Sequence, residues 1–405
     1  MGITARLKEK AALMDPDRYG RSDTSAAARW FWEIDRMLLL LVSVLIGIGL
    51  IGVAAASPAA AERYSGGNFR LPELYYFYRQ LAWIAIGVPV MIAVSMLPRS
   101  TAKRISLAGA VIFMVLLVFV PIIGPEVNGA RRWLDIGVGQ LQPSEFLKPF
   151  FVVAMAWLLS LKQADKSLPV FTLSALLTLA VAYLLMRQPD FGSTIIFAVV
   201  WIAMLALAGA SLRMLGTLAM AGIAGVVLAY FFYGVATTRI DGFLFGQGDT
   251  FQTDNAMRTL TAGGLLGMGP GAGTRKFGLP EPHTDYIFSV IGEEFGLIAC
   301  LAIACLYLAI VARVLIKLLD EESTFAVLAA AGLAVQFGLQ ALINMAVNVQ
   351  IAPSKGMTLP FISYGGSSML ALSIGMGLLL AFTRRNPYLS RSPYVVKWSG
   401  ESLRA

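Results

Sequence analysis

Chemistry in this chain has to rest on carboxylates, basic side chains or hydroxyls, because other reactive residue types are scarce. There is a single histidine, His283, and the two cysteines, Cys300 and Cys305, lie five residues apart in one apolar run. A metal site built on several imidazoles is therefore excluded, and the cysteines indicate neither a structural disulfide nor a metal site. The candidate residues lie in five polar segments that alternate with long apolar stretches.

The first polar segment reads NGARRW at residues 128–133 and QLQPSEFLK at residues 140–148. Arg131 and Arg132 beside a tryptophan suit a phosphate ligand. Glu145 and Lys148 stand three residues apart at a helix start, so they can share a face and neutralise one another at a membrane edge. The alternative is that Lys148 extends alone to the interface while the arginines contact lipid headgroups.

The second segment, RQPDFGS at residues 187–193, is short and polar between two apolar runs. Its composition predicts a tight helix reversal in which Pro189 ends one helix and Asp190 is the N-cap of the next. Arg187 is the residue of this turn with a candidate role in binding an anion.

The third segment, residues 263–276, is rich in glycine and ends in Arg275 and Lys276. It matches neither of the glycine-rich nucleotide motifs in register, and no strand is expected before it, so a nucleotide site is not predicted. The glycines favour a flexible loop that approaches its neighbours closely, and the two basic residues add positive charge to it.

The fourth segment, LPEPHTDYIF at residues 279–288, carries Asp285 where a helix is expected to begin. Asp285 is either an N-cap or a functional carboxylate, and its position fits both. Glu293 and Glu294 follow inside an apolar stretch, where a charge costs roughly 2.5–3.5 kcal/mol. The two glutamates therefore predict an internal polar partner or a cavity.

The fifth segment begins with Asn344 and Asn348 and continues through residues 352–368, which are rich in Pro, Gly and hydroxyl side chains. Non-helical backbone beside a membrane span must be buried in protein or line a wet cavity. This segment is either a re-entrant connection or a wall of the site.

The composition indicates how these segments are supported. Of the 405 residues, 57% are hydrophobic and 14% are charged, and the mean hydropathy is +0.72. A soluble domain carries roughly 25% charged residues, so this chain is a membrane protein. A cytosolic enzyme, a secreted disulfide scaffold and a nucleic-acid-binding protein are excluded, despite the net charge of +8.

Apolar stretches of about the length of a bilayer predict an all-α polytopic fold with about ten transmembrane helices. The predicted spans are 37–56, 80–97, 105–123, 146–161, 168–186, 191–212, 214–238, 286–315, 323–350 and 366–382. Residues 37–383 then form one membrane domain with a long outer loop at 239–284 between helices 7 and 8. Residues 1–36 and 384–405 form a basic N-terminal tail and a C-terminal tail.

Basic residues are retained on the cytoplasmic side of a membrane, and their distribution gives the orientation. With both tails inside, 20 of the 32 Lys and Arg residues lie in inner segments and 11 in outer loops. The five polar segments then converge on the outer face, and both termini are cytoplasmic. Long ordered loops on a helical scaffold commonly carry function.

These motifs, in this order, resemble the SEDS family of FtsW/RodA-type peptidoglycan glycosyltransferases. The resemblance rests on the Asn-Gly-x-x-Arg-Trp, Gln-Pro-Ser-Glu-x-x-Lys, Gln-Pro-Asp-x-Gly, Leu-Pro-Glu-x-His-Thr-Asp and Leu-Pro-x-x-Ser-Tyr-Gly-Gly-Ser-Ser patterns. It covers nearly the whole membrane core, and the stretch KGMTLP at residues 355–360 looks closest to the division branch.

The resemblance implies an inner-membrane enzyme that polymerises lipid II on the outer face, at the division septum. The family's catalytic aspartate falls on Asp285, which would act as the general base in an inverting transfer. Its partners would be lipid II, the nascent glycan strand, membrane lipids, a class B penicillin-binding protein and other division proteins. No cofactor is firmly implied, although a divalent Mg or Mn ion could balance the diphosphate.

The remaining motif residues are assigned to substrate binding. They are Arg131, Arg132, Glu145, Lys148, Arg187, Gln188, Asp190, Glu281, His283, Lys355 and Ser363. Two rival functions stay open, a lipid-precursor flippase or transporter that uses the intramembrane charges and a scaffold that uses the outer loops for docking. Turnover by purified protein in detergent separates polymerisation from transport, because transport needs two compartments.

The charge distribution predicts that residues 239–284 lie outside and the C-terminus inside. A Gly271→Cys variant in intact cells is expected to react with a membrane-impermeant thiol reagent, whereas a cysteine added at the C-terminus reacts only after lysis. Labelling of the C-terminal cysteine in intact cells would rule out this topology.

Overall fold

The computed structural model describes residues 26–66, 70–126, 129–135, 137, 139–246 and 250–384. Asn128 and most of the two predicted tails fall outside these ranges. Within the predicted N-terminal tail, residues Ala26–Glu33 form a short helix, α3, which the apolar-span pattern does not predict.

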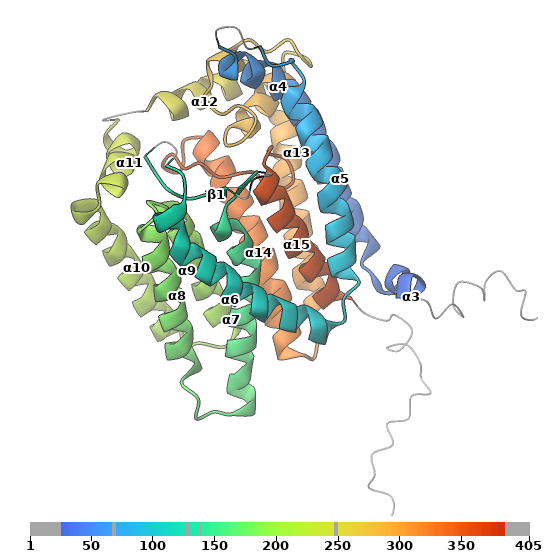
Figure 1. Ribbon diagram of the computed structural model, residues 1–405, viewed down its shortest axis with the longest axis vertical. Coiled ribbons are helices and arrows are strands. Elements are labelled where there is room, and N and C mark those ends of the chain that lie inside the picture. Colours follow the sequence, from blue (N-terminus) through green and yellow to red (C-terminus); the bar gives the residue numbers. More distant parts are fainter. Residues whose placement is uncertain are drawn as a thin grey trace, which may run out of the picture.

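The described chain is a helical bundle, as the apolar stretches predict (Figure 1). Eight helices are long and apolar enough to cross a membrane, and α8 and α9 are shorter apolar helices. Each overlaps one predicted span. These helices are α4 (Arg36–Tyr64), α5 (Tyr75–Ser95), α6 (Arg99–Ile123), α7 (Pro143–Ala164), α8 (Val170–Met186), α9 (Phe191–Leu207), α10 (Leu212–Phe232), α13 (Ile287–Leu318), α14 (Thr324–Asn348) and α15 (Gly366–Thr383).

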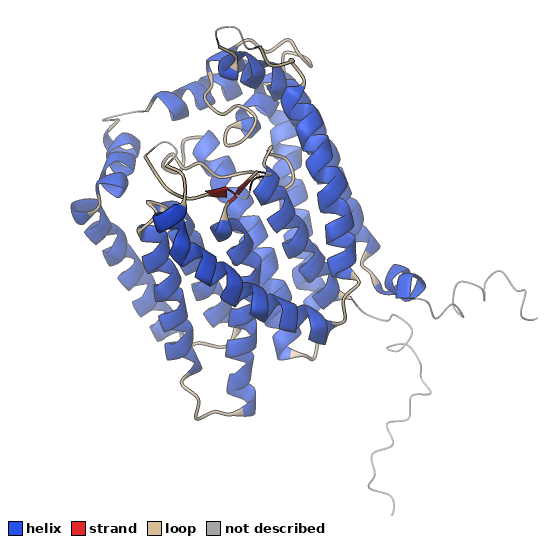
Figure 2. Ribbon diagram, viewed as in Figure 1, coloured by secondary structure: helices blue, strands red, loops and turns tan. Residues whose placement is uncertain are grey.

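The remaining elements belong to the connections at one end of the bundle, where Figure 2 also shows the short strand pair. The predicted span 214–238 is divided, because α10 ends at Phe232 and a new helix begins at Gly234. Part of the predicted outer loop is therefore helical. The connecting elements are α11 (Gly234–Phe245), α12 (Phe251–Ala262), the 3₁₀ helix η1 (Arg275–Gly278), β1 (Leu134–Asp135) and β2 (Gln140–Leu141).

Helices α7, α14 and α15 form the centre of the bundle, and most of their apolar side chains are buried. Helix α5 covers α15 on one side, and α6 crosses the front of the bundle obliquely (Figure 1). Helix α10 is peripheral, with none of its residues buried. The connections before α7 and between α14 and α15, which carry the first and fifth polar motifs, therefore adjoin the best-packed helices.

Helix α13 is broken at Gly296, where φ is 80° and ψ is 177°. A residue with a side chain disfavours this backbone conformation, and the break leaves backbone groups of α13 without helical partners. The glycine-rich loop supplies the partners: the amides of Met268 and Gly269 donate to the carbonyls of Glu293 and Glu294 at 2.9 and 3.0 Å. The loop is thus fitted into the break of the helix.

The same loop is the polar partner that the sequence predicts for Glu293 and Glu294. The Glu293 carboxylate accepts hydrogen bonds from the amides of Arg275 and Lys276 at 2.6 and 2.9 Å. The Glu294 carboxylate accepts from the amide of Gly271 at 2.6 Å and pairs with the Lys276 ammonium. Because Lys276 is buried in this pair, the expectation that it adds free positive charge to the loop is wrong.

The two described ends of the chain meet at the opposite end of the bundle. Arg384, just after α15, forms an ion pair with Glu33 of α3 at 3.3 Å. Asp35, the N-cap of α4, pairs with Arg313 and Lys317 of α13 at 3.0 and 3.2 Å. An even number of spans requires both ends to lie on one side, and this arrangement agrees with it.

Candidate functional site

Two long-range polar contacts hold the segment that carries Asp285 against the bundle. The side-chain amides of Asn344 and Asn348, one turn apart on α14, donate to the Asp285 carbonyl at 2.9 and 3.1 Å. Asn344 also donates to the Met357 carbonyl at 2.5 Å. Two non-helical segments, 279–286 and 349–365, are therefore fixed to the same face of α14.

The two segments are also bonded to each other through Ser363. Its hydroxyl donates to the Thr284 carbonyl at 2.6 Å and accepts from the Leu359 amide at 2.7 Å. The Tyr364 amide donates to the His283 carbonyl at 2.9 Å. Ser363 thus positions backbone beside Asp285, and the predicted fifth segment forms a wall of the site.

The Asp285 side chain lies outside the membrane-spanning part of α13, which begins at Ile287. The N-cap of that helix is Tyr286, and it makes no side-chain capping bond, so the capping interpretation of Asp285 is not supported. The carboxylate lies close to Gly356, where a Cβ atom would stand 2.7 Å from Oδ2. Burial, together with the negative charge of Glu281, raises the pKa of Asp285 to about 7, against the opposing charges of Lys355 and Arg132.

Lys355 supplies a cation whose charge acts on both Asp285 and Asp190. Its side chain lies across Gly192 at the start of α9, where a Cβ atom would overlap it. The Lys355 ammonium is buried and has no hydrogen-bond partner within the described residues. Burial lowers the pKa of Lys355 to about 7, although the charge of Asp190 opposes this shift. A buried and unsatisfied cation is costly unless a ligand pairs with it.

The turn before α9 has the structure that its sequence predicts. Asp190 is the N-cap and accepts from the Ser193 amide at 3.1 Å. Burial alone would raise the pKa of Asp190, but the charges of Lys355 and Arg132 lower it overall. Arg132 donates to the carbonyls of Gln188 and Pro189 at 3.3 and 2.5 Å.

One hydrogen bond gives Gln188 of this turn a structural role. Gln188 is buried, and its side-chain amide donates to the Leu117 carbonyl of α6 at 2.8 Å. It links two helices and does not present its amide to a ligand.

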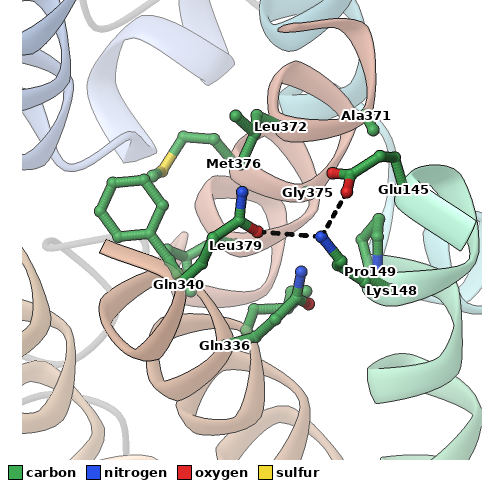
Figure 3. Close-up of a pocket in the computed structure, with 12 residues that line it drawn as sticks. Glu145, Lys148, Pro149, Gln336, Gln340, Ala371, Leu372, Gly375, Met376 and Leu379 are labelled. Carbon is green, nitrogen blue, oxygen red and sulfur yellow. Dashed lines mark hydrogen bonds and ion pairs between the residues drawn. The ribbon is translucent and has the colours of Figure 1, made fainter. Parts of the chain in front are cut away.

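Glu145 and Lys148 form the ion pair that their spacing predicts, at 2.6 Å on α7 (Figure 3). The Lys148 ammonium also donates to Gln340 of α14 at 3.2 Å. Gln340 in turn donates to the Thr358 carbonyl at 3.1 Å. Since Lys148 is 3% exposed, the alternative in which it extends to the interface is wrong.

Glu281 and His283 lie on the other side of the Asp285 segment. The Glu281 carboxylate accepts from the hydroxyls of Tyr64 and Thr284, the latter at 3.0 Å. His283 is 3% exposed, and burial lowers its pKa to about 4, so the ring is neutral at pH 7. Neither residue therefore supplies a cation to the site.

Two predicted arginines are not linked to Asp285 by any contact in the described part of the chain. Arg131 forms an exposed pair with Glu126 at 3.5 Å. Arg187 is exposed at the end of α8.

A cavity of about 620 Å³ opens between the outer helices α11 and α12 and the segment 349–365. Lys355 and Gly356 form part of its wall, and Gly356 is the residue that contacts the Asp285 carboxylate. Arg239 of α11 lines the same cavity and adds a second cation. The arrangement can bind an anionic group beside a carboxylate that titrates near neutrality.

From the sequence, Asn344 and Asn348 are named only as the start of the fifth segment, and Arg239 and Gln340 are not selected. A signal for three of them was present, because Gln336, Gln340, Asn344 and Asn348 recur every four residues in an otherwise apolar helix. Arg239 carried no comparable local signal.

Comparisons with known proteins identify the family of this chain. The model of the FtsW/RodA/SpoVE family, described as cell cycle proteins, matches residues 35–388. The chain belongs to this family. Among similar members, the protein named probable peptidoglycan glycosyltransferase FtsW from Caulobacter vibrioides is 38% identical over 91% of this chain and 94% of its own. The FtsW of Halorhodospira halophila, which bears the same name, is 36% identical over 86% and 90%.

Solved structures of the family share the fold. A chain of a peptidoglycan synthase complex that coordinates polymerization and crosslinking superposes with a TM-score of 0.71 at 26% identity, covering 86% of this chain and 97% of that one. The rod shape determining protein RodA of Thermus thermophilus gives a TM-score of 0.63 at 27% identity, over 86% and 96%.

The contribution of the Glu145–Lys148 pair to stability can be tested directly. Glu145→Gln or Lys148→Met leaves one buried charge unpaired, so each is expected to lower the free energy of unfolding by about 3 kcal/mol. The exchange Glu145→Lys with Lys148→Glu should recover part of this loss, but not the Gln340 contact. Unfolding in a mixed-detergent titration measures both effects, with the exposed Lys166→Met as the control. An exchange variant no more stable than the single variants would show that the pairing is not stabilising.

Proposed function

We propose that this chain is a peptidoglycan glycosyltransferase that polymerises lipid II at the outer face of the inner membrane during cell division. The observation that carries the proposal is Asp285, a carboxylate with a pKa of about 7 beside a cavity lined by Lys355 and Arg239. The family membership and the names of its FtsW relatives support the same activity.

The reaction needs a base and a place for a leaving diphosphate. Ionised Asp285 takes the proton of the acceptor sugar hydroxyl as its oxygen bonds to the anomeric carbon of the donor. The bond from that carbon to the lipid diphosphate breaks, and the diphosphate departs with the electron pair. General-base assistance of this kind contributes roughly 10²–10⁴ in rate. One displacement at the anomeric carbon inverts its configuration.

The cations near Asp285 fit the developing charge of the leaving group. Lys355 has a buried ammonium without a partner, and Arg239 lines the same cavity. Fixed positive charges aimed at a departing diphosphate lower the barrier without the need for a general acid. Lys148 is a poor choice for this task, since Glu145 already neutralises it.

Glu281 is a positioning residue in this mechanism. Both of its carboxylate oxygens already accept hydrogen bonds from hydroxyl groups. Its negative charge also contributes to the raised pKa of Asp285. The base with an unengaged carboxylate is therefore Asp285.

A divalent ion belongs to the proposal only together with the substrate. Within the described residues no group of three or more His, Cys, Asp or Glu side chains could hold a metal ion. Mg²⁺ commonly binds one or two carboxylates along with substrate phosphates. A Mg²⁺ or Mn²⁺ ion would therefore arrive with the diphosphate and be bound mainly through its oxygens.

The proposed partners follow from the family. A class B penicillin-binding protein would crosslink the strands that this chain makes, as polymerization and crosslinking are coordinated in the related synthase complex. Other division proteins at the septum, membrane lipids and cytoplasmic placement of both termini complete the proposal.

The Asp285→Asn variant tests the base directly. Asparagine caps a helix about as well as aspartate but cannot accept the proton. We expect normal expression and partner binding, with lipid II polymerisation by the purified complex lowered by roughly 10² or more. Asp165→Asn, on a turn at the other end of the bundle, is the control with unchanged activity. Substantial polymer formation by Asp285→Asn would show that another residue is the base.

The two groups with a pKa of about 7 predict a bell-shaped pH profile of kcat/KM. Activity rises toward pH 7 as Asp285 loses its proton, and it falls above pH 7 as Lys355 loses its charge. Arginine stays protonated throughout this range, so Lys355→Arg should remove the alkaline limb and keep the acid limb. Initial rates measured between pH 5 and 9 at constant ionic strength check this. An alkaline limb that is unchanged in Lys355→Arg would show that Lys355 is not the titrating cation.

A further inference from the structure

A cluster of aromatic rings lies at the outer ends of α4 and α5. We name Tyr64, Tyr75, Tyr76, His283 and Tyr364 the aromatic cluster. The ring of Tyr76 is its centre, with centroid distances of 4.1 Å to His283, 5.3 Å to Tyr364, 5.2 Å to Tyr75 and 6.2 Å to Tyr64. Three parts of the sequence that are distant from one another, around residues 64–76, 283 and 364, thus contribute rings to one place.

One side of the cluster is buried, and the other side is accessible. His283 is buried and packs against the rings of both Tyr76 and Tyr364, which also contact each other. The tyrosine rings are partly exposed, and Tyr64 is 45% exposed. The Arg79 guanidinium lies over the Tyr75 and Tyr364 rings at 5.6 and 5.9 Å, and it is exposed. The surface therefore combines ring faces with hydroxyl and guanidinium donors.

The cluster is built into the segment that carries Asp285. The Tyr64 hydroxyl donates to Glu281, and the Tyr364 amide donates to the carbonyl of His283. His283 is two residues before Asp285, a chain distance of at most about 7 Å. If one sugar of the glycan is bound at Asp285, the next sugar of the same glycan would therefore lie within reach of the rings.

The cluster and the cations lie on different sides of Asp285. Lys355 rests on Gly192 of α9, and Arg239 belongs to α11. The rings come from α4, α5 and the two segments that border them. Figure 1 shows α5 and α11 on opposite sides of the bundle. If the substrate diphosphate binds to Lys355 and Arg239, the aromatic side remains available for the uncharged sugars of the substrate.

We propose that the aromatic cluster is a glycan subsite, which binds a sugar ring of the growing strand next to the ring that reacts at Asp285. The C–H face of a sugar packs on the electron-rich face of an aromatic ring, and the tyrosine hydroxyls and Arg79 can bond its hydroxyl and acetamido groups. The inference deepens the proposed function and rests on it.

Tyrosines at the ends of membrane-spanning helices can also form an aromatic belt that anchors the helices at the lipid surface. A belt presents rings outward, singly, and has no preference for a sugar. Here the rings pack on one another around a buried histidine, and one hydroxyl is bound to Glu281. Tyr78 is the comparison within the same helix, since it is 62% exposed and its ring contacts only Phe77 among the described aromatic pairs.

The test measures binding of a lipid-free β-1,4-linked N-acetylglucosamine–N-acetylmuramic acid tetrasaccharide to the purified full chain. The Asp285→Asn background prevents turnover, and saturation-transfer NMR reports which sugar protons contact the protein. Tyr76→Ala and Tyr75→Ala are expected to weaken binding about tenfold each, the size of one lost ring contact. Tyr76→Phe, which keeps the ring, should weaken binding less than Tyr76→Ala does, and Tyr78→Ala should bind as the parent protein does.

In the catalytically intact chain, Tyr75→Ala should raise KM for lipid II and shorten the glycan product while kcat stays within about twofold. Tetrasaccharide binding that is equal in Tyr75→Ala, Tyr76→Ala and the parent would overturn the subsite. So would an equal loss in Tyr78→Ala, which is the result expected of a lipid belt. Thermal unfolding confirms folding, and Tyr75→Ala decides the matter where Tyr76→Ala is unstable. Polymerisation by Asp285→Asn would contradict the proposed base alone and leave the binding result standing.

Discussion

The structure depends on two asparagine amides that hold the carbonyl of Asp285. Backbone that leaves the helical conformation near a membrane must find hydrogen-bond partners within the protein, because lipid offers none. Asn344 and Asn348 supply them from α14, one of the central helices of the bundle. The bond from Asn344 to the Met357 carbonyl brings the segment with Lys355 and Gly356 to the same place. One face of α14 therefore positions the base Asp285, the cation Lys355 and the cavity wall at Gly356.

Two ion pairs and two charged groups without an ion pair stand out at this end. Glu294 with Lys276, and Glu145 with Lys148, are neutralised within the protein and fix a loop and a helix start. Breaking such a pair is costly, which makes these residues supports of the site. Among the described residues Lys355 has no hydrogen-bond partner and Asp285 forms no ion pair, and the pKa of each is about 7. An unpaired buried charge is tolerated where a ligand completes it, as expected of groups that meet a substrate.

Local patterns in the sequence predicted the local features well. Apolar length gave the spans, a spacing of three gave the Glu145–Lys148 pair, and turn composition gave Asp190 as an N-cap. The features that failed depend on contacts between distant segments. Nothing near Lys276 shows that it is buried against Glu294, and nothing near Gln188 shows its bond to Leu117. Spacing within a helix reports which residues share a face, but not what that face meets in the fold.

The arrangement around Asp285 also suits the stereochemistry of an inverting transfer. The acceptor oxygen must approach the anomeric carbon from the face opposite the leaving diphosphate. The cations that fit a diphosphate come from α11 and from Lys355 against α9, whereas the rings that fit a sugar come from α4 and α5. A carboxylate held between these two surfaces can meet the incoming hydroxyl on the side away from the departing charge. Such a division also gives the new strand a path that does not cross the lipid diphosphate, which repeated addition requires.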